Sequence, residues 1–291
     1  MSTFVRTARA ALAGASAALL LAVAGCANGA RAHVSTPPAH PRVVSLVPSM
    51  TEDLFAIGAG DQVAGVSAYT DYPPEAKRLP VVASFASIDT ERIVGLHPNL
   101  CIGIVAQERL AGDVRRAGIP VVLLKDDSFS DIFGNLERLG DLTGHRTEAR
   151  AVEARLRART AALVDRAKRR ARRPAVFVVL GVEPVFTIGH GSYIEHLIEL
   201  AGGRNASSDV AQPYARYSAE ALVARQPDVI VADPDVRLRD VIGKPPWTAL
   251  RAVKLHHVYT LPDAAILERP GPRYNDGLAW LIATLDGAER S

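Results

Sequence analysis

The feature that most constrains the fold of this chain is a short segment that occurs twice. "TERIVGLHPNLCIGI" begins at Thr90, and "AEALVARQPDVIVAD" begins at Ala219. Each copy has the pattern of a short helix, a proline turn and an apolar strand. Aligned without a gap, the copies match Glu91 with Glu220, Val94 with Val223, Pro98 with Pro227, and Asn99 with Asp228. The repetition predicts two α/β units of similar build.

Apolar runs alternate with helical patterns on both sides of the middle of the chain. Short strand-like runs separated by helices are typical of α/β units with largely parallel sheets. The runs are 42–47, 63–67, 100–105 and 119–124 in the first series, and 175–181, 228–233 and 257–261 in the second. We therefore predict an amino-terminal lobe over residues 42–130 and a carboxyl-terminal lobe over residues 175–291.

Residues 131–174, between the two series, are predicted to form linker helices. The helical pattern weakens at Gly140 and Gly144, and about 25 residues without glycine or proline follow, a helix ~37 Å long. The cations of Lys168–Arg173 suit the carboxyl end of that helix and are predicted to be solvated. One stiff helix between the lobes allows less lobe motion than flexible strands would. A ligand is expected between the lobes, at the carboxyl ends of parallel strands.

The first 25 residues have the features of a secretory signal peptide. Arg6 and Arg9 precede an apolar or small run that is too short to span a bilayer comfortably. The run ends in "VAGC", which resembles the lipobox of bacterial lipoproteins and implies a diacylglycerol on the Cys26 thiol. The alternative is an ordinary secretory signal with an incidental cysteine. Residues 26–41 are small, polar and proline-bearing, and are predicted to tether the folded body to an extracytoplasmic membrane surface.

Charge and cysteine content argue against a nucleic-acid-binding protein and against a disulfide-stabilised one. Removal of the signal peptide takes two arginines and no acid, so the formal charge falls from +3 to +1. Nucleic-acid binding therefore gains no electrostatic support. After Cys26 only Cys101 remains, so no intrachain disulfide can form in the mature chain. Cys101 lies in an apolar run and is predicted to be a buried small hydrophobe.

Four segments occur in a characteristic order: "RVVSLVPSMTEDLFAIGAGDQVAGVSAYTDYPPEAK", "IDTERIVGLHPNL", "PVFTIGHGSYIEHLIELAGG" and "LERPGPR". With the lipobox, two lobes and one spanning helix, the chain resembles the substrate-binding proteins of ABC importers for metal chelates, the class III periplasmic binding proteins. "YTDYPP" is similar to the cobalamin-binding branch. The resemblance implies a monomer that is not an enzyme and has no cofactor or metal of its own. Its cargo would be cobalamin or a related corrinoid, delivered to a permease dimer with ATPase subunits.

The resemblance gives the repeated glutamates a role. In such proteins one surface acid per lobe meets arginines on the two permease subunits, and the matching positions are Glu91 and Glu220. Each also follows a helix N-cap candidate, Asp89 or Thr90 in the first copy and Ser218 in the second. An acid in the first turn stabilises a helix without any partner, so both roles can hold together.

The resemblance also implies ligand contacts at six positions, which are Pro48, Tyr69, Phe85, Phe186, Tyr214 and Arg269. Aromatic rings suit a flat macrocycle because they offer large contact area at low entropy cost. Three departures from the cobalamin-binding branch leave the chelate open within the class. Phe85 and Tyr214 stand where tryptophan is expected, Ile104 replaces an aromatic residue, and "AAILERPG" lacks the polar and aromatic residues expected before the arginine.

Haem or an iron siderophore is the alternative chelate. Tyr69 could be an axial ligand of haem iron, since a tyrosinate is an accepted haem ligand. Siderophores call for several basic residues, and Arg269 with Arg216 or Arg273 is a thin supply.

A hydrolase of the cell envelope is the alternative from another class. "IGHGSYIEH" places His190, Ser192, Glu195 and His196 together. Glu195 and His196 are adjacent in a predicted helix and so diverge, and Ser192 or Gly191 is predicted to cap that helix. The sequence contains no nucleophile elbow, P-loop or zinc-protease motif, and a lone His-His pair makes no metal site.

Overall fold

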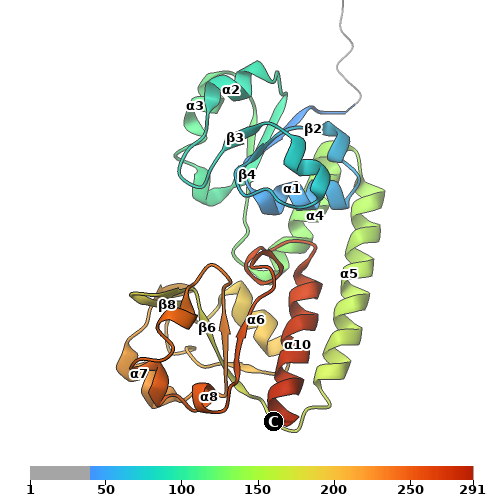
Figure 1. Cartoon of the computed structure of the whole chain (residues 1–291). Helices are drawn as coiled ribbons and strands as arrows, with labels where there is room; N and C mark the ends of the chain where they lie inside the picture. Colours follow the sequence, from blue (N-terminus) through green and yellow to red (C-terminus); the bar gives the residue numbers. More distant parts are fainter. Residues whose placement is uncertain (1–39, 291) are drawn as a thin grey trace, which may run out of the picture. The chain divides into compact units, whose positions relative to one another are not determined.

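The computed structural model describes residues 40–290, which belong to one compact unit beginning at Pro38. The predicted signal peptide, Cys26 and nearly all of the predicted tether lie outside the described residues. The described strands form separate sheets in two lobes, with helices packed around them (Figure 1). The predicted α/β fold class is confirmed.

The sheet of the first lobe is entirely parallel. Its strands lie in the order β3-β2-β1-β4-β5, and their bounds are β1 Val43–Ser45, β2 Val63–Ser67, β3 Val81–Ala83, β4 Leu100–Ile104 and β5 Val121–Leu124. Strands covered on both faces need apolar side chains pointing both ways, which is why these segments are continuous apolar runs. Cys101 is buried on β4, as predicted, and burial raises the pKa of its thiol to about 12.

Helices cover both faces of this first sheet. They are α1 (Pro48–Ala56), α2 (Thr90–Gly95) and α3 (Gly112–Arg116). On one face, Met50 and Leu54 of α1 join a core that continues into the linker helices. On the other face, Ile93 of α2 and Val114 of α3 pack on the strands.

The second lobe contains a parallel sheet and a smaller antiparallel one. The parallel strands lie in the order β12-β11-β6-β9, with bounds β6 Ala175–Val179, β9 Arg204–Asn205, β11 Val229–Ala232 and β12 Val258–Thr260. The antiparallel strands are β7 Gly181–Val182, β8 Val185–Ile188 and β10 Tyr214–Arg216. The helices of this lobe are α6 Tyr193–Leu200, α7 Ala219–Arg225, α8 Arg251–Lys254, α9 Ala265–Glu268 and α10 Tyr274–Arg290. The antiparallel sheet was not predicted.

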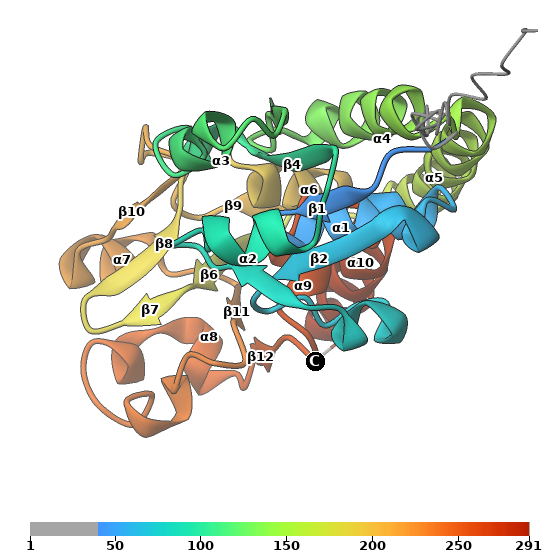
Figure 2. The same ribbon diagram turned by 90° about the horizontal axis from the view of Figure 1, so that it is seen from above.

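Two linker helices connect the lobes, α4 (Phe129–Thr143) and α5 (Arg146–Ala167). The 22 residues of α5 rise ~33 Å, and the helix runs beside both lobes (Figures 1 and 2). The chain turns at Gly144, whose φ of 80° lies in the left-handed region. Gly140 is not a weak point, because it lets the two helices pack closely: a Cβ there would lie 2.7 Å from that of Ala149.

The prediction that the cations after α5 are all solvated is wrong for Arg170. Its side chain is only 2% exposed and is paired with Asp286 of α10. It also donates to the carbonyl oxygens of Ala201 at 2.6 Å and Ile282 at 3.2 Å. Arg170 therefore ties the end of the linker to α10 and to the residue after α6.

The repeated segments form equivalent units. α2 leads to β4, which pairs with β1, and α7 leads to β11, which pairs with β6. Asn99 accepts a hydrogen bond from the backbone N–H of Arg42 at 2.8 Å, and Asp228 accepts one from Ala175 at the same distance. The turns also match, since His97 (φ 49°) and Gln226 (φ 43°) are both left-handed. The two copies of the repeated segment therefore fold into the same backbone unit.

Candidate functional site

The loops at the carboxyl edge of the first sheet present the residues predicted from that lobe. Ser67 of β2 and Ala83 of β3 are paired across the sheet. Tyr69 follows Ser67 by two residues, and Phe85 follows Ala83 by two residues. Pro48 is the first residue of α1, just after β1. Since the strand order is β3-β2-β1, Phe85, Tyr69 and Pro48 follow one another along this edge. Both rings are strongly exposed, Tyr69 at 80% and Phe85 at 83%.

Ile104, which stands at an expected aromatic position, does not extend this row. It is 8% exposed and belongs to the core, whereas the next residue, Val105, is 49% exposed after β4. Sequence reasoning missed Val105 because the predicted strand, 100–105, included it, whereas β4 ends at Ile104. An aliphatic side chain therefore continues the exposed row beyond Pro48.

The antiparallel sheet presents the residues predicted from the second lobe. Phe186 on β8 lies opposite Arg216 on β10, and Tyr214 lies opposite Ile188. Directly paired residues point to the same face, so Phe186 and Tyr214 share one face of this sheet. Phe186 is 36% exposed and Tyr214 is 43% exposed. The unpredicted strands are thus what places these two rings together.

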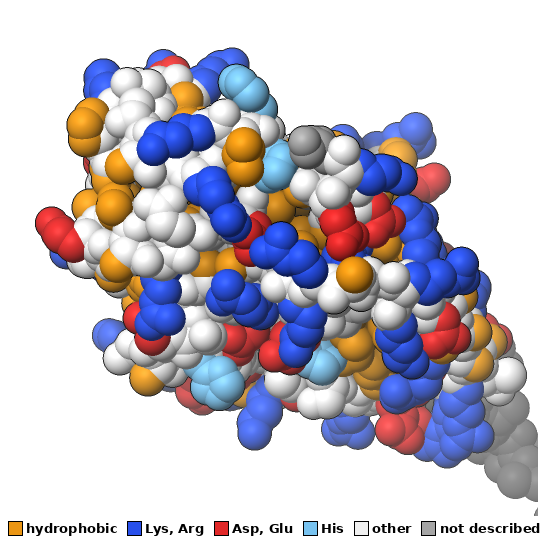
Figure 3. All heavy atoms as spheres, turned by 90° about the horizontal axis from the view of Figure 1, so that it is seen from below, with side chains coloured by type: hydrophobic (Ala, Val, Ile, Leu, Met, Phe, Trp, Pro, Cys, Tyr) orange, Lys and Arg blue, Asp and Glu red, His pale blue; other side chains and the backbone are white. Residues whose placement is uncertain are grey.

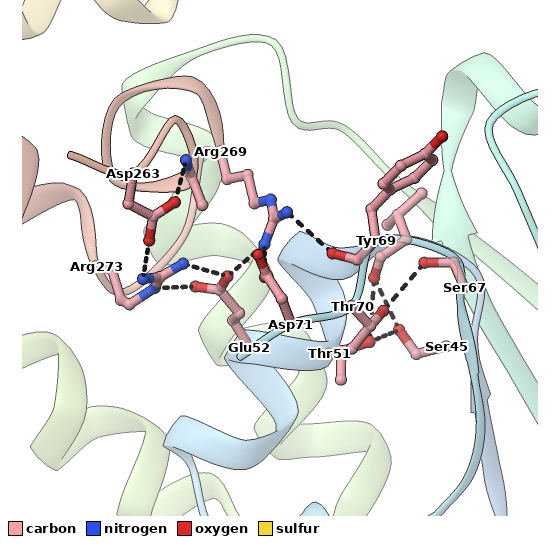
Figure 4. A network of polar contacts seen from close by, with 12 residues as sticks. Ser45, Thr51, Glu52, Ser67, Tyr69, Thr70, Asp71, Asp263, Arg269 and Arg273 are labelled. Atoms are coloured by element: carbon pink, nitrogen blue, oxygen red, sulfur yellow. Dashed lines mark hydrogen bonds and ion pairs between the residues drawn. The ribbon is translucent and has the colours of Figure 1, made fainter. Parts of the chain in front are cut away.

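Arg269 follows α9 in the second lobe and reaches the first lobe. Its Nη1 lies 3.1 Å from Oε1 of Glu52 and 2.5 Å from Oδ1 of Asp71, and its Nη2 donates to the Tyr69 carbonyl oxygen at 2.9 Å (Figure 4). Its side chain is 21% exposed. The structure therefore brings Arg269 and Tyr69 together, although through the tyrosine backbone. The Tyr69 ring points away from the ion pairs (Figure 4).

Arg273 makes a second connection between the lobes. It donates two hydrogen bonds to Glu52, at 2.9 and 3.1 Å, and one to Asp263 at 2.9 Å. Burial lowers the pKa of the Arg273 guanidinium, but the Glu52 and Asp263 carboxylates outweigh it and hold that pKa above its ordinary value. The ring of Tyr72 lies 4.3 Å from the same guanidinium.

Glu52 is a buried acid inside α1. α1 begins at Pro48, so Glu52 lies beyond its first turn, and its side chain is 1% exposed. A buried carboxylate needs donors, and Glu52 takes three hydrogen bonds from Arg269 and Arg273. Its function in the fold is to join the lobes.

Carboxyl groups from both lobes lie close enough to Tyr214 for their charges to act on its phenol. Burial, followed by the charges of Glu268, Asp126 and Asp127, raises the pKa of Tyr214 to about 12. Burial and then the carboxyls of Asp233 and Asp235 raise the pKa of Glu268 to about 8. Burial and then the charge of Asp127 raise the pKa of Asp126 to about 6. The region beside the aromatic side chains is therefore rich in acid, which the sequence did not reveal.

The two repeated glutamates occupy equivalent, exposed positions. Glu91 is the second residue of α2, whose N-cap Asp89 accepts from the backbone N–H of Arg92. Glu220 is the second residue of α7, whose N-cap Ser218 accepts from Ala221. Both helices lie away from α5 (Figures 1 and 2).

The histidine-rich segment before α6 is a helix cap. The Ser192 hydroxyl accepts a hydrogen bond from the Glu195 backbone N–H at 3.1 Å, as predicted for a cap. The Glu195 carboxylate accepts from the Gly191 N–H at 2.6 Å and from the Asn205 amide at 3.1 Å, and lies 3.1 Å from the His190 ring. The serine oxygen thus caps the helix, and it accepts from a backbone donor rather than facing a general base.

Charges of both signs are interleaved on the lower face, with apolar side chains between them (Figure 3). Ion pairs such as Arg237–Asp240, at 2.7 Å, and Arg251–Asp228 neutralise cations of the second lobe locally. Within residues 40–290, no three histidine, cysteine or acidic side chains are grouped as a metal site would need. None of the described helices combines the length and apolar character needed to cross a bilayer.

Comparison with known proteins identifies the family. The family model described as "Periplasmic binding protein" matches residues 43–265. The chain belongs to the periplasmic binding protein family. The match includes both parallel sheets, the linker helices and the aromatic residues of the site, whereas Glu268, Arg269 and Arg273 follow its end.

Individual relatives narrow the class. An uncharacterized ABC transporter substrate-binding lipoprotein of Bacillus subtilis, YvrC, is 27% identical over 84% of this chain and 79% of its own. The vitamin B12-binding protein of Yersinia pestis is 33% identical over 65% of this chain and 68% of its own. This protein is accordingly a substrate-binding protein of an ABC importer, and the proteins it resembles bind solutes rather than act as enzymes.

Solved structures show the same class III architecture. The periplasmic vitamin B12-binding protein BtuF of Vibrio cholerae has a TM-score of 0.75 at 27% identity, over 87% of this chain and 99% of its own. The periplasmic heme-binding protein RhuT of Roseiflexus has a TM-score of 0.77 at 30% identity, over 86% of this chain and 99% of its own. The fold is therefore shared by binders of different chelates.

Proposed function

We propose that this protein captures cobalamin or a related corrinoid between its lobes and delivers it to an ABC permease. The ligand would contact the rings of Phe85 and Tyr69 on one side, and those of Phe186 and Tyr214 on the other. Pro48 and Val105 would complete the first-lobe surface. Support comes from the vitamin B12-binding relatives and from the exposed aromatic residues at the carboxyl edge of one lobe and on the second lobe.

The observation that carries this choice is the acid-rich surrounding of Tyr214. A corrinoid bears neutral primary amides around its ring, and carboxylates accept hydrogen bonds from amide N–H groups. Haem bears carboxylates, which would lie near Asp126, Asp127 and Asp233 at a cost from like-charge repulsion. Arg269 and Arg273 are already paired with acids, so free cations are scarce for anionic siderophores as well.

Haem is the second candidate because of one specific observation. The Tyr69 ring is 80% exposed and points away from the ion pairs, so its phenol oxygen is free to approach a metal (Figure 4). The similarity to RhuT of Roseiflexus supports the same alternative. Haem bound in this way would show the absorption spectrum of a tyrosinate-ligated ferric centre.

Docking to the permease would use Glu91 and Glu220. Their equivalent places on α2 and α7 present one carboxylate per lobe, which suits a permease of two similar subunits carrying arginines. Charges at the rim of an interface mainly set the encounter rate and the register of docking. Lipidation of Cys26 would hold the protein at the extracytoplasmic membrane surface, which is consistent with the lipoprotein name of the Bacillus subtilis relative.

Calorimetric titration with cyanocobalamin, haemin and a ferric siderophore tests the proposal. Cyanocobalamin is expected to bind most tightly, and replacing Tyr214 or Phe186 by alanine should weaken it about tenfold each, as expected for a lost aromatic contact. The matched control is Leu255→Ala, since Leu255 is 52% exposed at the end of α8, and it should leave affinity unchanged. Tighter binding of haemin than of cyanocobalamin would contradict the corrinoid proposal and favour haem as the ligand.

A further inference from the structure

Tyr69 is held in an unfavourable backbone conformation. Its φ of 65° lies in the left-handed region, which a bulky aromatic residue seldom adopts and which costs about 1–2 kcal/mol. Such a residue persists only where its surroundings impose it. Within the first lobe, the Thr70 backbone N–H donates to the Ser67 carbonyl oxygen at 3.3 Å and closes the turn around Tyr69. From the second lobe, Arg269 Nη2 donates to the Tyr69 carbonyl oxygen at 2.9 Å.

Arg269 is itself held from the opposite lobe. Among the described residues, its three acceptors are on Glu52, Asp71 and Tyr69 of the first lobe, whereas Arg269 follows α9 of the second. Its planar guanidinium presents donors in a fixed geometry, so one group can address the two carboxylates and the carbonyl together. The contact with Tyr69 therefore exists only at the present spacing of the lobes.

We propose that Arg269 is a positioning residue that couples the spacing of the lobes to the placement of the Tyr69 ring. While the lobes are together, Arg269 offsets the strain of Tyr69 and keeps its ring at the ligand. When the permease spreads the lobes, the guanidinium withdraws, the Tyr69 backbone relaxes, and its contact with the ligand is lost. The ligand-release step rests on the proposed function, but the structural coupling does not.

This role differs from that of a direct ligand contact. Arg269 is only 21% exposed, and its charge faces Glu52 and Asp71 at 3.1 and 2.5 Å. Arg273 continues to donate two hydrogen bonds to Glu52 when Arg269 is removed, so the buried carboxylate keeps a cationic partner. An Arg269→Met variant is therefore expected to fold.

Hydrogen exchange followed by mass spectrometry tests the coupling without any ligand. In Arg269→Met, backbone amides in residues 67–73 should exchange about tenfold faster, because the loop loses one hydrogen bond and opens more often. Arg269→Lys keeps the charge but has a single nitrogen to serve three acceptors, so it should show the same local effect. The control is Arg115→Met, which removes an exposed pair with Glu108 at 2.5 Å and should leave residues 67–73 unchanged. Unchanged exchange in Arg269→Met, or faster exchange throughout the first lobe, would overturn the proposal.

A double-mutant cycle tests the consequence for binding, with cyanocobalamin and haemin as probes. Arg269→Met should lower the affinity for whichever probe binds about tenfold in the wild-type background. When Tyr69 is already alanine, it should lower that affinity less than about twofold. Additive losses would mean that Arg269 contacts the ligand itself and would overturn the positioning role. If neither probe binds the wild-type protein, the proposed corrinoid and haem functions both fail, while the exchange experiment still decides the coupling.

Discussion

Replacing Asp53 by asparagine is expected to stabilise the protein, and to do so more at neutral pH than at pH 4. Asp53 lies beside Glu52 on α1 but in a different environment. It is fully buried, and neither of its carboxyl oxygens has a hydrogen-bond partner among the described residues. Burial, and then the charge of Glu52, raises the pKa of Asp53 well above its ordinary value.

The size of the effect follows from proton linkage. In the unfolded chain Asp53 has a pKa of about 3.9 and loses its proton above that pH. The folded state keeps the proton to a higher pH, so the free energy of unfolding falls as pH rises between the two pKa values, by up to about 1.4 kcal/mol per pH unit. The upper limit by pH 7 is about 4 kcal/mol, and asparagine, which has no proton to take up, removes this loss.

Urea unfolding at pH 4, 5.5 and 7 measures the difference. The free energy of unfolding of Asp53→Asn should match that of the wild type near pH 4 and exceed it increasingly up to pH 7. Asp61→Asn is the control, because Asp61 is exposed and its replacement should change stability little at any pH. A stability difference between Asp53→Asn and wild type that does not vary with pH would refute the reasoning.

Four further outcomes are expected from other parts of the molecule. Alanine at both Glu91 and Glu220 should leave ligand affinity intact and abolish uptake in cells; normal uptake would remove the docking role. Arg170→Met should lower the free energy of unfolding by about 3 kcal/mol, because the Ala201 and Ile282 carbonyl oxygens and the Asp286 carboxylate each lose a buried donor, and a loss below about 1 kcal/mol in urea unfolding would contradict this. Haemin affinity should fall about tenfold as pH rises through about 8, where Glu268 gains its charge, and should not do so in Glu268→Gln. Cys26→Ser should release the protein from the membrane fraction, and continued sedimentation with membranes would contradict lipidation.

The repeated segment was the most informative part of the sequence, for a physical reason. Its helix, turn and strand are local structures, and local patterns of apolar residues, caps and prolines determine them. The N-caps of α2 and α7 and the strands β4 and β11 were therefore predicted. The antiparallel strands were missed because strands this short carry little periodic signal.

The polar contacts between the lobes could not be predicted, because they join residues far apart in sequence. Glu52 and Arg273 are separated by 221 positions, and the residues around Glu52 do not indicate that Arg273 is its partner. The acids near Tyr214 could not be predicted for the same reason, since Asp126 and Glu268 both act on Tyr214 only through the arrangement of the two lobes. The ligand contacts came from resemblance, and they stay a prediction until a ligand is bound.

The most direct measurement is the position of cobalt in crystals grown with cyanocobalamin, located by anomalous scattering. One strong cobalt peak is expected between the aromatic residues of the two lobes, with Tyr69 and Phe85 on one side and Phe186 and Tyr214 on the other. A peak elsewhere, for example in the crevice of about 490 Å³ lined by Arg155, Arg159 and Tyr72, or no bound cobalt at all, would contradict it.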